Sequence, residues 1–427
     1  MKILVVGSGA REHALARALT IVPAENDVVV APGNPGTASI ARNAAVDPLD
    51  PAAVAALALA EGADLVVVGP EAPLVAGVAD TVRAAGIPCF GPDAAAAHLE
   101  GSKAFAKEVM AAADVPTARA YVCTTIDEVA EALDAFGAPY VVKDDGLAAG
   151  KGVVVTDDLG AALEHARGCL DRELTPGQPA PTIVVEEFLD GPEVSLFCLC
   201  DGTDAVPLAP AQDFKRLGDG DAGPNTGGMG AYSPLPWAPP ELVEEVMERV
   251  ARPVVREMAR RGTPFVGVLY CGLALTSRGV RVIEFNARFG DPETQVVLPR
   301  LATPLDQLLL AAATGTLATA PEPRWHDNAA VTVVVAAHGY PEEVRRGDRI
   351  DGIGAAEELP GVHVLHAGTA AASEGDLSCD GGRVLSVVGV GDDLTAARLA
   401  AYDGVKRITI AGSQHRSDIA AAVAVQP

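Results

Sequence analysis

Short apolar runs separated by segments with helical spacing are the feature that most constrains how this chain can fold. Residues 2–6, 28–30 and 65–68 are such runs, each ends near a glycine or a proline, and residues 11–19 have the spacing of a helix. Strands that alternate with helices indicate a parallel α/β sheet. No run approaches the roughly 20 residues that a helix needs to cross a bilayer. We therefore predict an N-terminal α/β domain and no contact with a membrane.

Charge and cysteine usage limit the class of protein. Lys and Arg total 32 against 57 Asp and Glu, so the formal net charge is −25. Such a chain repels nucleic-acid phosphates unless its basic residues gather in one patch, and the sequence has no such patch. The seven cysteines are scattered through apolar runs, which favours reduced core thiols over a zinc site. The first residues lack the pattern of a secretory signal, so we expect a cytoplasmic protein. Because of its acidic charge, we also expect it to bind no nucleic acid.

Two stretches of opposite character follow the N-terminal domain. Residues 140–143, 153–155 and 183–186 are short apolar runs, and residues 159–170 have helical spacing. This order of elements predicts a compact α+β lobe. Residues 201–240 are rich in Gly, Pro and Asp and have little periodicity, so we expect one long ordered loop there.

The last part of the chain predicts a further helix, two strands and a closing domain. Helical spacing returns at residues 241–261, and strands are expected near 266–275 and 280–285. The Pro-Glu-Pro sequence at 321–323 is typical of a linker. The remaining apolar runs and a final helix, which together predict a small β-rich unit, lie at 330–337, 363–367, 383–390 and 394–405.

Glycines after the first apolar run form the first candidate site. Gly7 and Gly9 lie where the expected strand turns into a helix, and N–H groups at a helix start can bind a phosphate. The segment matches the dinucleotide fingerprint G-x-G-x-x-G only in part, because Glu12 stands at the third glycine. A structural turn or a cradle for a substrate phosphate is therefore favoured over NAD binding.

A second glycine-rich segment follows a strand that ends at Lys143. Gly146, Gly150 and Gly152 lie in this segment together with Lys151, in a chain with only seven lysines. A flexible loop with free N–H groups and flanking lysines suits a polyphosphate. Because the segment lacks the pattern G-x-x-x-x-G-K-[ST], a β-hairpin with surface lysines is an equal alternative.

Two further segments carry polar groups. Glu284 and Asn286 alternate onto one face of an expected strand, and two such oxygen ligands suit Mg²⁺, which completes its shell with water and phosphate oxygens. A solvent-facing edge is the alternative, but the carboxylates of residues 289–293 favour a function. Residues 224–230 combine three glycines with Asn and Thr, which suits a nest of backbone amides for an anion or an amino acid as well as an ordinary surface turn.

Through these four segments, the chain resembles the phosphoribosylamine-glycine ligases, a family of ATP-grasp enzymes of purine biosynthesis. Residues 223–232 and 288–293 are highly specific to that family. The likeness runs nearly end to end and also includes residues 7–14, 31–34, 68–74, 99–103, 146–152, 185–189 and 284–287.

The resemblance implies an α/β and α+β multidomain fold with a two-lobe ATP-grasp core. The implied units are an N-terminal α/β substrate-binding domain at 1–101, a larger lobe at 102–122 and 191–322, a small mobile lobe at 123–190, and a C-terminal β-rich domain at 326–427.

The resemblance also implies roles for individual residues. Lys103 and Lys143 would hold ATP phosphates, the 146–152 loop would close over them, residues 186–189 would face adenine, and Glu193 would bind the ribose. The implied ATP-binding residues are Lys103, Lys143, Gly146, Gly150, Lys151, Gly152, Glu186, Glu187, Phe188, Leu189 and Glu193. The implied substrate-binding residues are Gly9, Asn34, Pro70, Glu71, Asp213, Lys215, Asn225, Thr226, Gly227, Gly228, Met229, Gly230, Arg288, Gly290, Asp291, Pro292 and Glu293. The implied catalytic residues are Lys143, Arg288 and Asp291, and Glu284 and Asn286 would hold Mg²⁺ or Mn²⁺.

Two positions depart from the pattern of related enzymes. Asp144 stands where many relatives have a small residue, which places a carboxylate beside Lys143. Many ATP-grasp enzymes supply a second metal carboxylate from the preceding strand, whereas residues 267–272 have none. The metal shell is therefore expected to depend on phosphates and water.

The reaction implied by the resemblance is the ligation of glycine to 5-phosphoribosylamine through glycyl phosphate, giving glycinamide ribonucleotide, ADP and phosphate. We expect a monomer.

Another ATP-grasp carboxylate-amine ligase is the alternative within enzymes, and residues 225–230 with 288–293 argue against it. A nucleotide-binding module without catalysis is the alternative outside enzymes, and the pair Glu284 and Asn286 argues against that.

Overall fold

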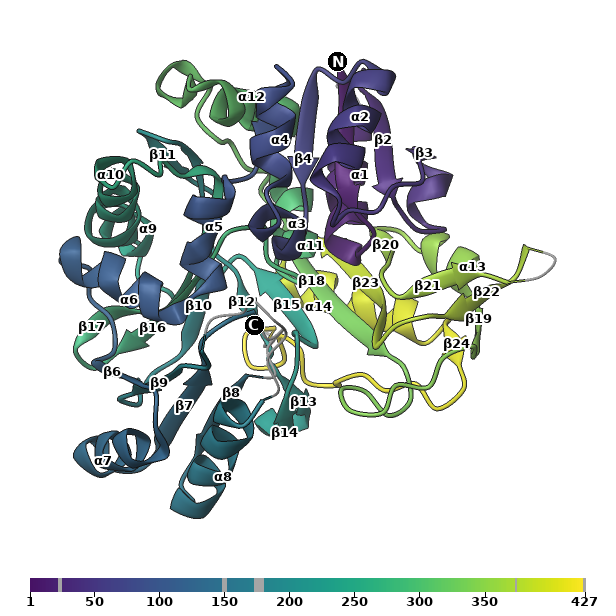
Figure 1. Ribbon diagram of the computed structural model, residues 1–427. Helices are drawn as coiled ribbons and strands as arrows, with labels where there is room; N and C mark the ends of the chain where they lie inside the picture. The colour runs from purple at the N-terminus through teal and green to yellow at the C-terminus, as the bar shows by residue number, and fades with distance from the viewer. Residues whose placement is uncertain (22–24, 148–151, 173–179, 373–374, 425–427) are drawn as a thin grey trace.

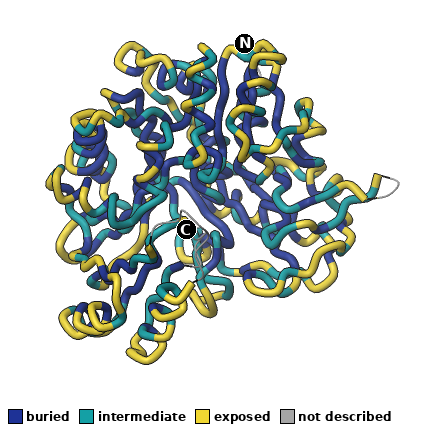
Figure 2. Tube along the Cα trace, in the orientation of Figure 1, coloured by how far each residue is buried: buried dark blue, intermediate teal, exposed yellow. Residues whose placement is uncertain are grey.

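The computed structural model describes residues 1–21, 25–147, 152–172, 180–372 and 375–424. In Figure 1 the N-terminal domain lies at the top, the C-terminal domain at the right, the larger lobe at the left and the small lobe at the lower left. Buried residues run through the centre where these units meet, and exposed residues line the outer helices (Figure 2). Within the described residues, no helix is both long enough and apolar enough to span a membrane.

The N-terminal domain is a parallel sheet in the order β3-β2-β1-β4-β5, which confirms the predicted fold class. Leu4 and Val6 face one core and Ile3 and Val5 face another, so β1 is buried on both sides. The strands are β1 (Lys2–Gly7), β2 (Asp27–Pro32), β3 (Arg42–Asn43), β4 (Leu65–Val68) and β5 (Cys89–Phe90). The helices are α1 (Ala10–Thr20), η1 (Thr37–Ser39), α2 (Pro51–Glu61), α3 (Glu71–Val75), α4 (Val78–Ala84) and α5 (Ala94–Gly101).

The small lobe has a hydrophobic core of its own, formed between an antiparallel sheet in the order β6-β9-β7-β8 and two helices. A capping box fixes the start of α7, because the Thr125 hydroxyl accepts from the N–H of Glu128 and the Glu128 carboxylate accepts from the N–H of Thr125. The elements are β6 (Ala120–Cys123), α7 (Ile126–Phe136), β7 (Tyr140–Asp144), β8 (Val153–Thr156), α8 (Leu159–Leu170) and β9 (Ile183–Glu186).

The larger lobe is built on the antiparallel sheet β11-β10-β16-β17. Helix α10 packs against it through buried Val254, Val255 and Met258 and turns its arginines outward. The strands are β10 (Glu193–Asp201), β11 (Ala205–Pro207), β16 (Val266–Thr276) and β17 (Gly279–Asn286). The helical segments are α6 (Lys103–Ala112), α9 (Leu242–Val246), η3 (Met247–Ala251), α10 (Arg252–Arg260), α11 (Thr294–Val297), η4 (Leu298–Arg300), α12 (Leu305–Thr314) and η5 (Leu317–Thr319).

The C-terminal domain contains the sheets β12-β15-β18-β23-β20 and β21-β22-β19-β24. Helix α14 covers the first of them and ends at Val405, as the sequence predicts. The strands are β18 (Ala329–Ala336), β19 (Arg349–Asp351), β20 (Val362–His366), β21 (Thr369–Ala371), β22 (Leu377–Cys379), β23 (Arg383–Gly391) and β24 (Thr409–Ile410). The helices are α13 (Ile353–Glu357) and α14 (Leu394–Val405).

The expectation of one long loop at 201–240 is wrong. This segment contains several short strands, and Gly230–Ser233 pairs with β18 in the C-terminal sheet. Runs of two to four residues are too short to show a period, and their partners lie far away in the chain, so the sequence gives no local signal for them. The short elements are β12 (Gln212–Asp213), β13 (Arg216–Gly218), η2 (Asp219–Asp221), β14 (Ala222–Asn225) and β15 (Gly230–Ser233).

Neutral histidines join the N-terminal and C-terminal domains. The backbone N–H of His366 donates to Nδ1 of His13 at 2.9 Å, and the Arg17 guanidinium lies 3.0 Å from Nδ1 of His363. Burial lowers the pKa of His13 to about 3, with further contributions from His366 and Arg17. Burial also lowers the pKa of His366 to about 4. Nδ1 of His13 accepts a hydrogen bond, so protonating it would bring its new N–H into repulsive contact with the backbone N–H of His366.

These histidines predict a loss of stability in acid. A histidine that is neutral when folded takes up a proton on unfolding below its unfolded pKa of about 6.5, which lowers the free energy of unfolding by about 1.4 kcal/mol per pH unit. We expect His13→Asn, whose amide oxygen keeps an acceptor near Nδ1, to flatten the pH dependence between about pH 6.5 and 4 by about that amount. Urea titrations at several pH values measure it. An unchanged slope would contradict the prediction.

Candidate active site

The turn after β1 is occupied by a carboxylate from the chain itself. The N–H of Gly9 donates to Oε2 of Glu12 at 2.6 Å, and Nε of Arg11 donates to Oε1 at 2.6 Å. A Cβ at Gly7 or Gly69 would lie within 2.6 Å of this side chain, so the glycines make room for Glu12. A buried carboxylate here repels a phosphate. The geometry of the turn therefore argues against a dinucleotide phosphate at this point, and the substrate role of Gly9 stays a prediction.

Arg288 joins the end of β17 to the N-terminal domain. Its guanidinium contacts Glu71 at 3.1 Å and Glu100 at 2.9 Å, and Glu100 also accepts from the N–H of Ala287 at 2.7 Å. Burial would raise the pKa of Glu71, but Arg288 and Arg11 outweigh it and hold the pKa below its ordinary value. This pairing places two predicted site residues, Arg288 and Glu71, in direct contact.

A buried Glu186 carboxylate bridges two lysines from different lobes. It lies 2.8 Å from Nζ of Lys143 on β7 and 2.9 Å from Nζ of Lys107 on α6. Burial would raise the pKa of Glu186, but Lys143 and Lys107 outweigh it and lower the pKa. The side chain of Glu186 is thus held by the two lysines, and its backbone pairs with Val141 on β7. Lys107 was missed from the sequence, although its spacing of four residues from Lys103 on one helix was a usable signal.

The residues that lead into the glycine loop are tied to the start of α6. Nζ of Lys103 donates to the carbonyl of Gly146 at 2.9 Å, and Asp145 accepts from Ser102 at 3.1 Å. Asp144, the unusual residue, points elsewhere and pairs with Arg172 at 2.6 Å. The departure at Asp144 is therefore compensated by an arginine rather than by Lys143.

The rest of the glycine loop is only partly described. Gly150 and Lys151, predicted to bind ATP, lie outside the described residues. Gly152 is buried, and its carbonyl accepts from the N–H of Asp144 at 2.7 Å.

Glu284 and Asn286 share one face of β17, next to three lysines. A β-bulge at Ile283 keeps Glu284 opposite Gly272, and the Ile283 carbonyl accepts from Lys143 at 3.2 Å. Burial would raise the pKa of Glu284, but the lysines outweigh it and lower the pKa; they are Lys215, Lys143 and Lys103.

The donor set on β17 fits a divalent cation. An ionised carboxylate beside an amide oxygen is the type of ligand pair that Mg²⁺ and Mn²⁺ accept. Among the described residues, no three His, Cys, Asp or Glu side chains are arranged to hold a metal ion. Further ligands would therefore come from phosphates and water.

A second group of carboxylates lies beside this strand. Nζ of Lys215 contacts Glu193 at 2.6 Å, and Ser195 donates to Glu293 at 2.9 Å. Burial raises the pKa of Asp213 to about 8, Lys215 lowers it and Glu293 raises it further. Asp213 is therefore largely protonated at neutral pH, which reduces repulsion among the carboxylates.

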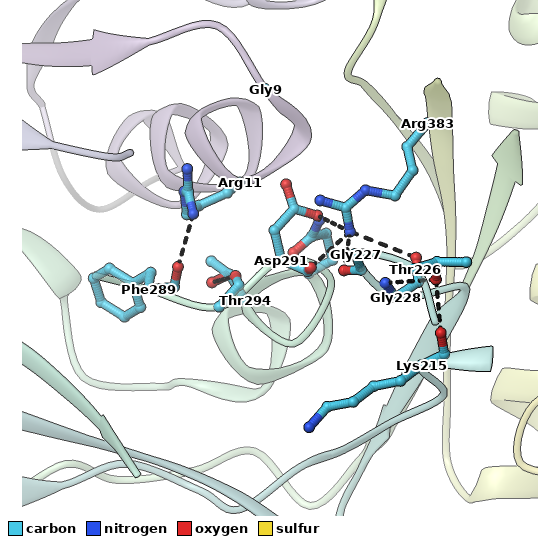
Figure 3. Close-up of polar contacts among 12 residues, drawn as sticks. Gly9, Arg11, Lys215, Thr226, Gly227, Gly228, Phe289, Asp291, Thr294 and Arg383 are labelled. Atoms are coloured by element: carbon cyan, nitrogen blue, oxygen red, sulfur yellow. Dashed lines mark hydrogen bonds and ion pairs between the residues drawn. The ribbon is translucent and has the colours of Figure 1, made fainter. Parts of the chain in front are cut away.

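The turn around Gly227 and the turn at Asp291 are held together by the C-terminal domain (Figure 3). Arg383 on β23 contacts the carbonyls of Gly227 at 2.5 Å and Asp291 at 2.7 Å, and Gly227 donates to the hydroxyl of Tyr340 at 3.0 Å. Arg383 and Tyr340 could not be predicted as site residues from the sequence, because neither lies in a polar motif.

Some predicted substrate residues are already engaged in the fold. The side chain of Asn34 donates to the carbonyls of Ser8 and His366 at 2.8 and 2.9 Å and accepts from Thr37, so it joins two domains. Met229 is fully buried in the core. Phe188, in contrast, is 45% exposed beside the predicted adenine site.

The remaining predicted residues lie at the ends of helices and strands, in turns or in ion pairs. Pro70 is the N-cap of α3, Asn225 ends β14 and Gly230 begins β15. A Cβ at Gly290 would lie 2.5 Å from Glu293. Glu187 pairs with Arg119 and Arg278, and Leu189 is half-buried.

Comparison with known proteins covers nearly the whole chain. The phosphoribosylglycinamide synthetase patterns match residues 1–100 (N domain), 101–294 (ATP-grasp (A) domain) and 330–422 (C domain). The phosphoribosylamine-glycine ligase of Streptomyces coelicolor is 66% identical over 426 residues, covering 99% of this chain and 100% of that protein. The same enzyme of Mycobacterium tuberculosis is 56% identical over 424 residues, covering 98% and 97%.

Solved structures give the same result. The phosphoribosylamine-glycine ligase of Thermotoga maritima superposes with a TM-score of 0.83 at 32% identity, covering 98% of this chain and 100% of that chain. The biotin carboxylase domain of Hydrogenobacter thermophilus 2-oxoglutarate carboxylase has a TM-score of 0.70 at 18% identity, covering 97% and 91%. The second likeness concerns the fold alone.

The Lys107–Glu186 contact predicts a stability effect. Lys107→Met removes a charge partner of a buried carboxylate, so we expect the free energy of unfolding to fall by about 3 kcal/mol. Lys406→Met is the matched control, since its side chain is 70% exposed, and should cost less than about 0.5 kcal/mol. Urea titration at neutral pH measures both variants. Equal, small effects would show that Lys143 alone compensates Glu186.

Proposed function

This chain belongs to the phosphoribosylglycinamide synthetase family, and on that premise we propose that it ligates glycine to 5-phosphoribosylamine at the expense of ATP. The products are glycinamide ribonucleotide, ADP and phosphate. The observation that carries the proposal is the meeting of Lys143 of the small lobe with the Glu284 strand of the larger lobe. Cations gathered at this meeting point support the proposal that a triphosphate binds between the two lobes.

The chemical path runs through an acyl phosphate. A glycine carboxylate oxygen attacks the γ-phosphorus, the bond to the β-γ bridging oxygen breaks, and ADP leaves. The amine of phosphoribosylamine then attacks the acyl carbon of glycyl phosphate, and phosphate leaves as the amide forms and the amine loses a proton. Lys103 and Lys143 would compensate the negative charge on the transferred oxygens.

Residues of the larger lobe and the N-terminal domain would hold the other reactants. Arg288 has a pKa held above its ordinary value by Glu100 and Glu71 despite burial, so it carries a permanent charge for a carboxylate or a phosphate. Glu284 and Asn286 would hold Mg²⁺ or Mn²⁺, which supplies neutralisation of phosphate charge when bound. Glu193 would reach the ribose once it releases Lys215, and Phe188 would pack on adenine.

The finer organisation is part of the same proposal. We propose the four units 1–101, 102–122 with 191–322, 123–190 and 326–427. Two strands cross these borders. Strand β6 of the small-lobe sheet starts at Ala120, and β15, from the segment 191–322, pairs with β18 in the C-terminal sheet. A net charge of −25 disfavours self-association, which supports a monomer, and we propose that this monomer acts in the cytoplasm.

Oxygen transfer tests the reaction. With glycine labelled by ¹⁸O in its carboxylate, we expect one labelled oxygen to appear in inorganic phosphate and ADP to be the nucleotide product, because the attacking oxygen stays on phosphorus. Mass spectrometry of both products, with phosphoribosylamine omitted as the control, measures the transfer. Label in AMP, or pyrophosphate in place of phosphate, would overturn the proposal.

Removing the charge of Glu284 tests the metal assignment. Glu284→Gln keeps the shape of the side chain but weakens a hard anionic ligand, so we expect the Mn²⁺ concentration for half-maximal activity to rise at least about tenfold. Electron paramagnetic resonance of Mn²⁺ with ADP measures binding directly. Glu108→Gln, at a side chain 70% exposed, is the matched control. Unchanged Mn²⁺ affinity would place the metal elsewhere.

A further inference from the structure

We propose that Arg383 of the C-terminal domain is a positioning residue that locks the Gly227–Gly228 turn onto the Asp291 turn and so orders the phosphoribosylamine end of the site. The proposal rests on the function proposed above. It extends the site to a third domain, in which the sequence predicts no site residue.

One nitrogen of Arg383 makes all the contacts. Nη1 lies 2.5 Å from the carbonyl of Gly227, 2.7 Å from the carbonyl of Asp291, 3.5 Å from the carbonyl of Gly228 and 3.4 Å from Oδ1 of the Asp291 carboxylate. The side chain is only 23% exposed, so these charge-assisted hydrogen bonds are shielded from water. The guanidinium reaches toward both turns from β23 in Figure 3.

The two turns lack side chains that would hold them together. Gly228 has a φ of +108°, and a Cβ there would lie 2.4 Å from Cδ of Pro292, so only glycine fits against the Asp291 turn. Thr226 accepts from the N–H of Gly228 at 3.0 Å, which shapes the turn but does not attach it. Attachment therefore depends on the backbone groups of Gly227.

Both backbone groups of the Gly227 turn are taken by the C-terminal domain. The Gly227 N–H donates to the hydroxyl of Tyr340 at 3.0 Å, and the Gly227 carbonyl accepts from Arg383. A Cβ at Gly382 would lie 2.4 Å from the Tyr340 ring, so the residue before Arg383 seats this ring closely. Tyr340 and Arg383 thus form one clamp.

The geometry places the effect at phosphoribosylamine rather than at ATP. Oδ1 of Asp291 accepts from Gln295 at 2.7 Å, while Oδ2 faces the N-terminal domain, 3.8 Å from an ideal Cβ on Gly9. Gly9 is one of the residues that the family resemblance assigns to phosphoribosylamine, so Asp291 lies on the side of the N-terminal domain where that substrate would bind. Of the lysines expected to bind ATP, the two within the described residues contact other groups: Lys103 of α6 donates to Gly146, and Lys143 of the small lobe contacts Ile283 and Glu186.

Steady-state kinetics with each substrate varied in turn test the clamp. We expect Arg383→Gln to raise KM for phosphoribosylamine at least tenfold and to change KM for ATP less than twofold. Arg383→Lys should recover more than half of the loss, because one ammonium nitrogen can replace the single nitrogen that makes the contacts. Tyr340→Phe should raise the same KM by about threefold. Arg346→Gln, whose side chain is 68% exposed in the same domain, is the control.

Hydrogen exchange provides a readout that needs no turnover. We expect peptides that cover residues 226–230 to exchange at least tenfold faster in Arg383→Gln than in the parent or in Arg346→Gln. Unchanged exchange and unchanged KM would overturn the role of Arg383, as would equal rises in KM for all three substrates. An inactive parent would overturn the proposed reaction instead, and the exchange result would then decide the clamp alone.

Discussion

Compensation of buried charge is the constraint on which the rest of this structure depends. A site for a triphosphate and a phosphorylated sugar must concentrate cations, and each cation withdrawn from water needs a fixed partner. The partners come from different units: Lys143 shares Glu186 with Lys107 across the two lobes, and Arg288 is held by Glu71 and Glu100 of the N-terminal domain. The charges that would serve the substrates are therefore the same charges that join the domains.

The sequence predicts what is local and misses what is distant. Alternating apolar runs predict the parallel sheet, and the helix ending at Val405 is predicted at its correct bounds, because each depends on nearby periodicity and caps. The short strands between 205 and 233 are missed, since β15 is stabilised by β18, about a hundred residues away. Tertiary pairing decides such segments, and no local pattern records it.

The candidate site shows the same division. Lys143, Glu284 and Arg288 stand out because each polar residue follows an apolar strand, and these three lie close together in the structure. Lys107 and Arg383 act through contacts that only the fold creates, and the carboxylate of Glu12 fills a turn that the glycine spacing alone left open to a phosphate. The spacing of glycines predicts where a turn leaves room beside the backbone, but it does not predict which group fills that room.

The contacts of Lys143 show how a lysine can be fixed in position by the protein and still be able to bind a phosphate. An ammonium group has three donors. Glu186 at 2.8 Å and the Ile283 carbonyl at 3.2 Å engage two of them, and within the described part of the chain the third would be available to a phosphate oxygen. ATP would then gain a contact without breaking one, so the lysine need not reorganise as negative charge develops on the transferred oxygens. Electrostatic stabilisation is greatest when its groups are fixed before the reaction begins. The bulge that presents the Ile283 carbonyl is thus as much a part of the site as the lysine that it holds.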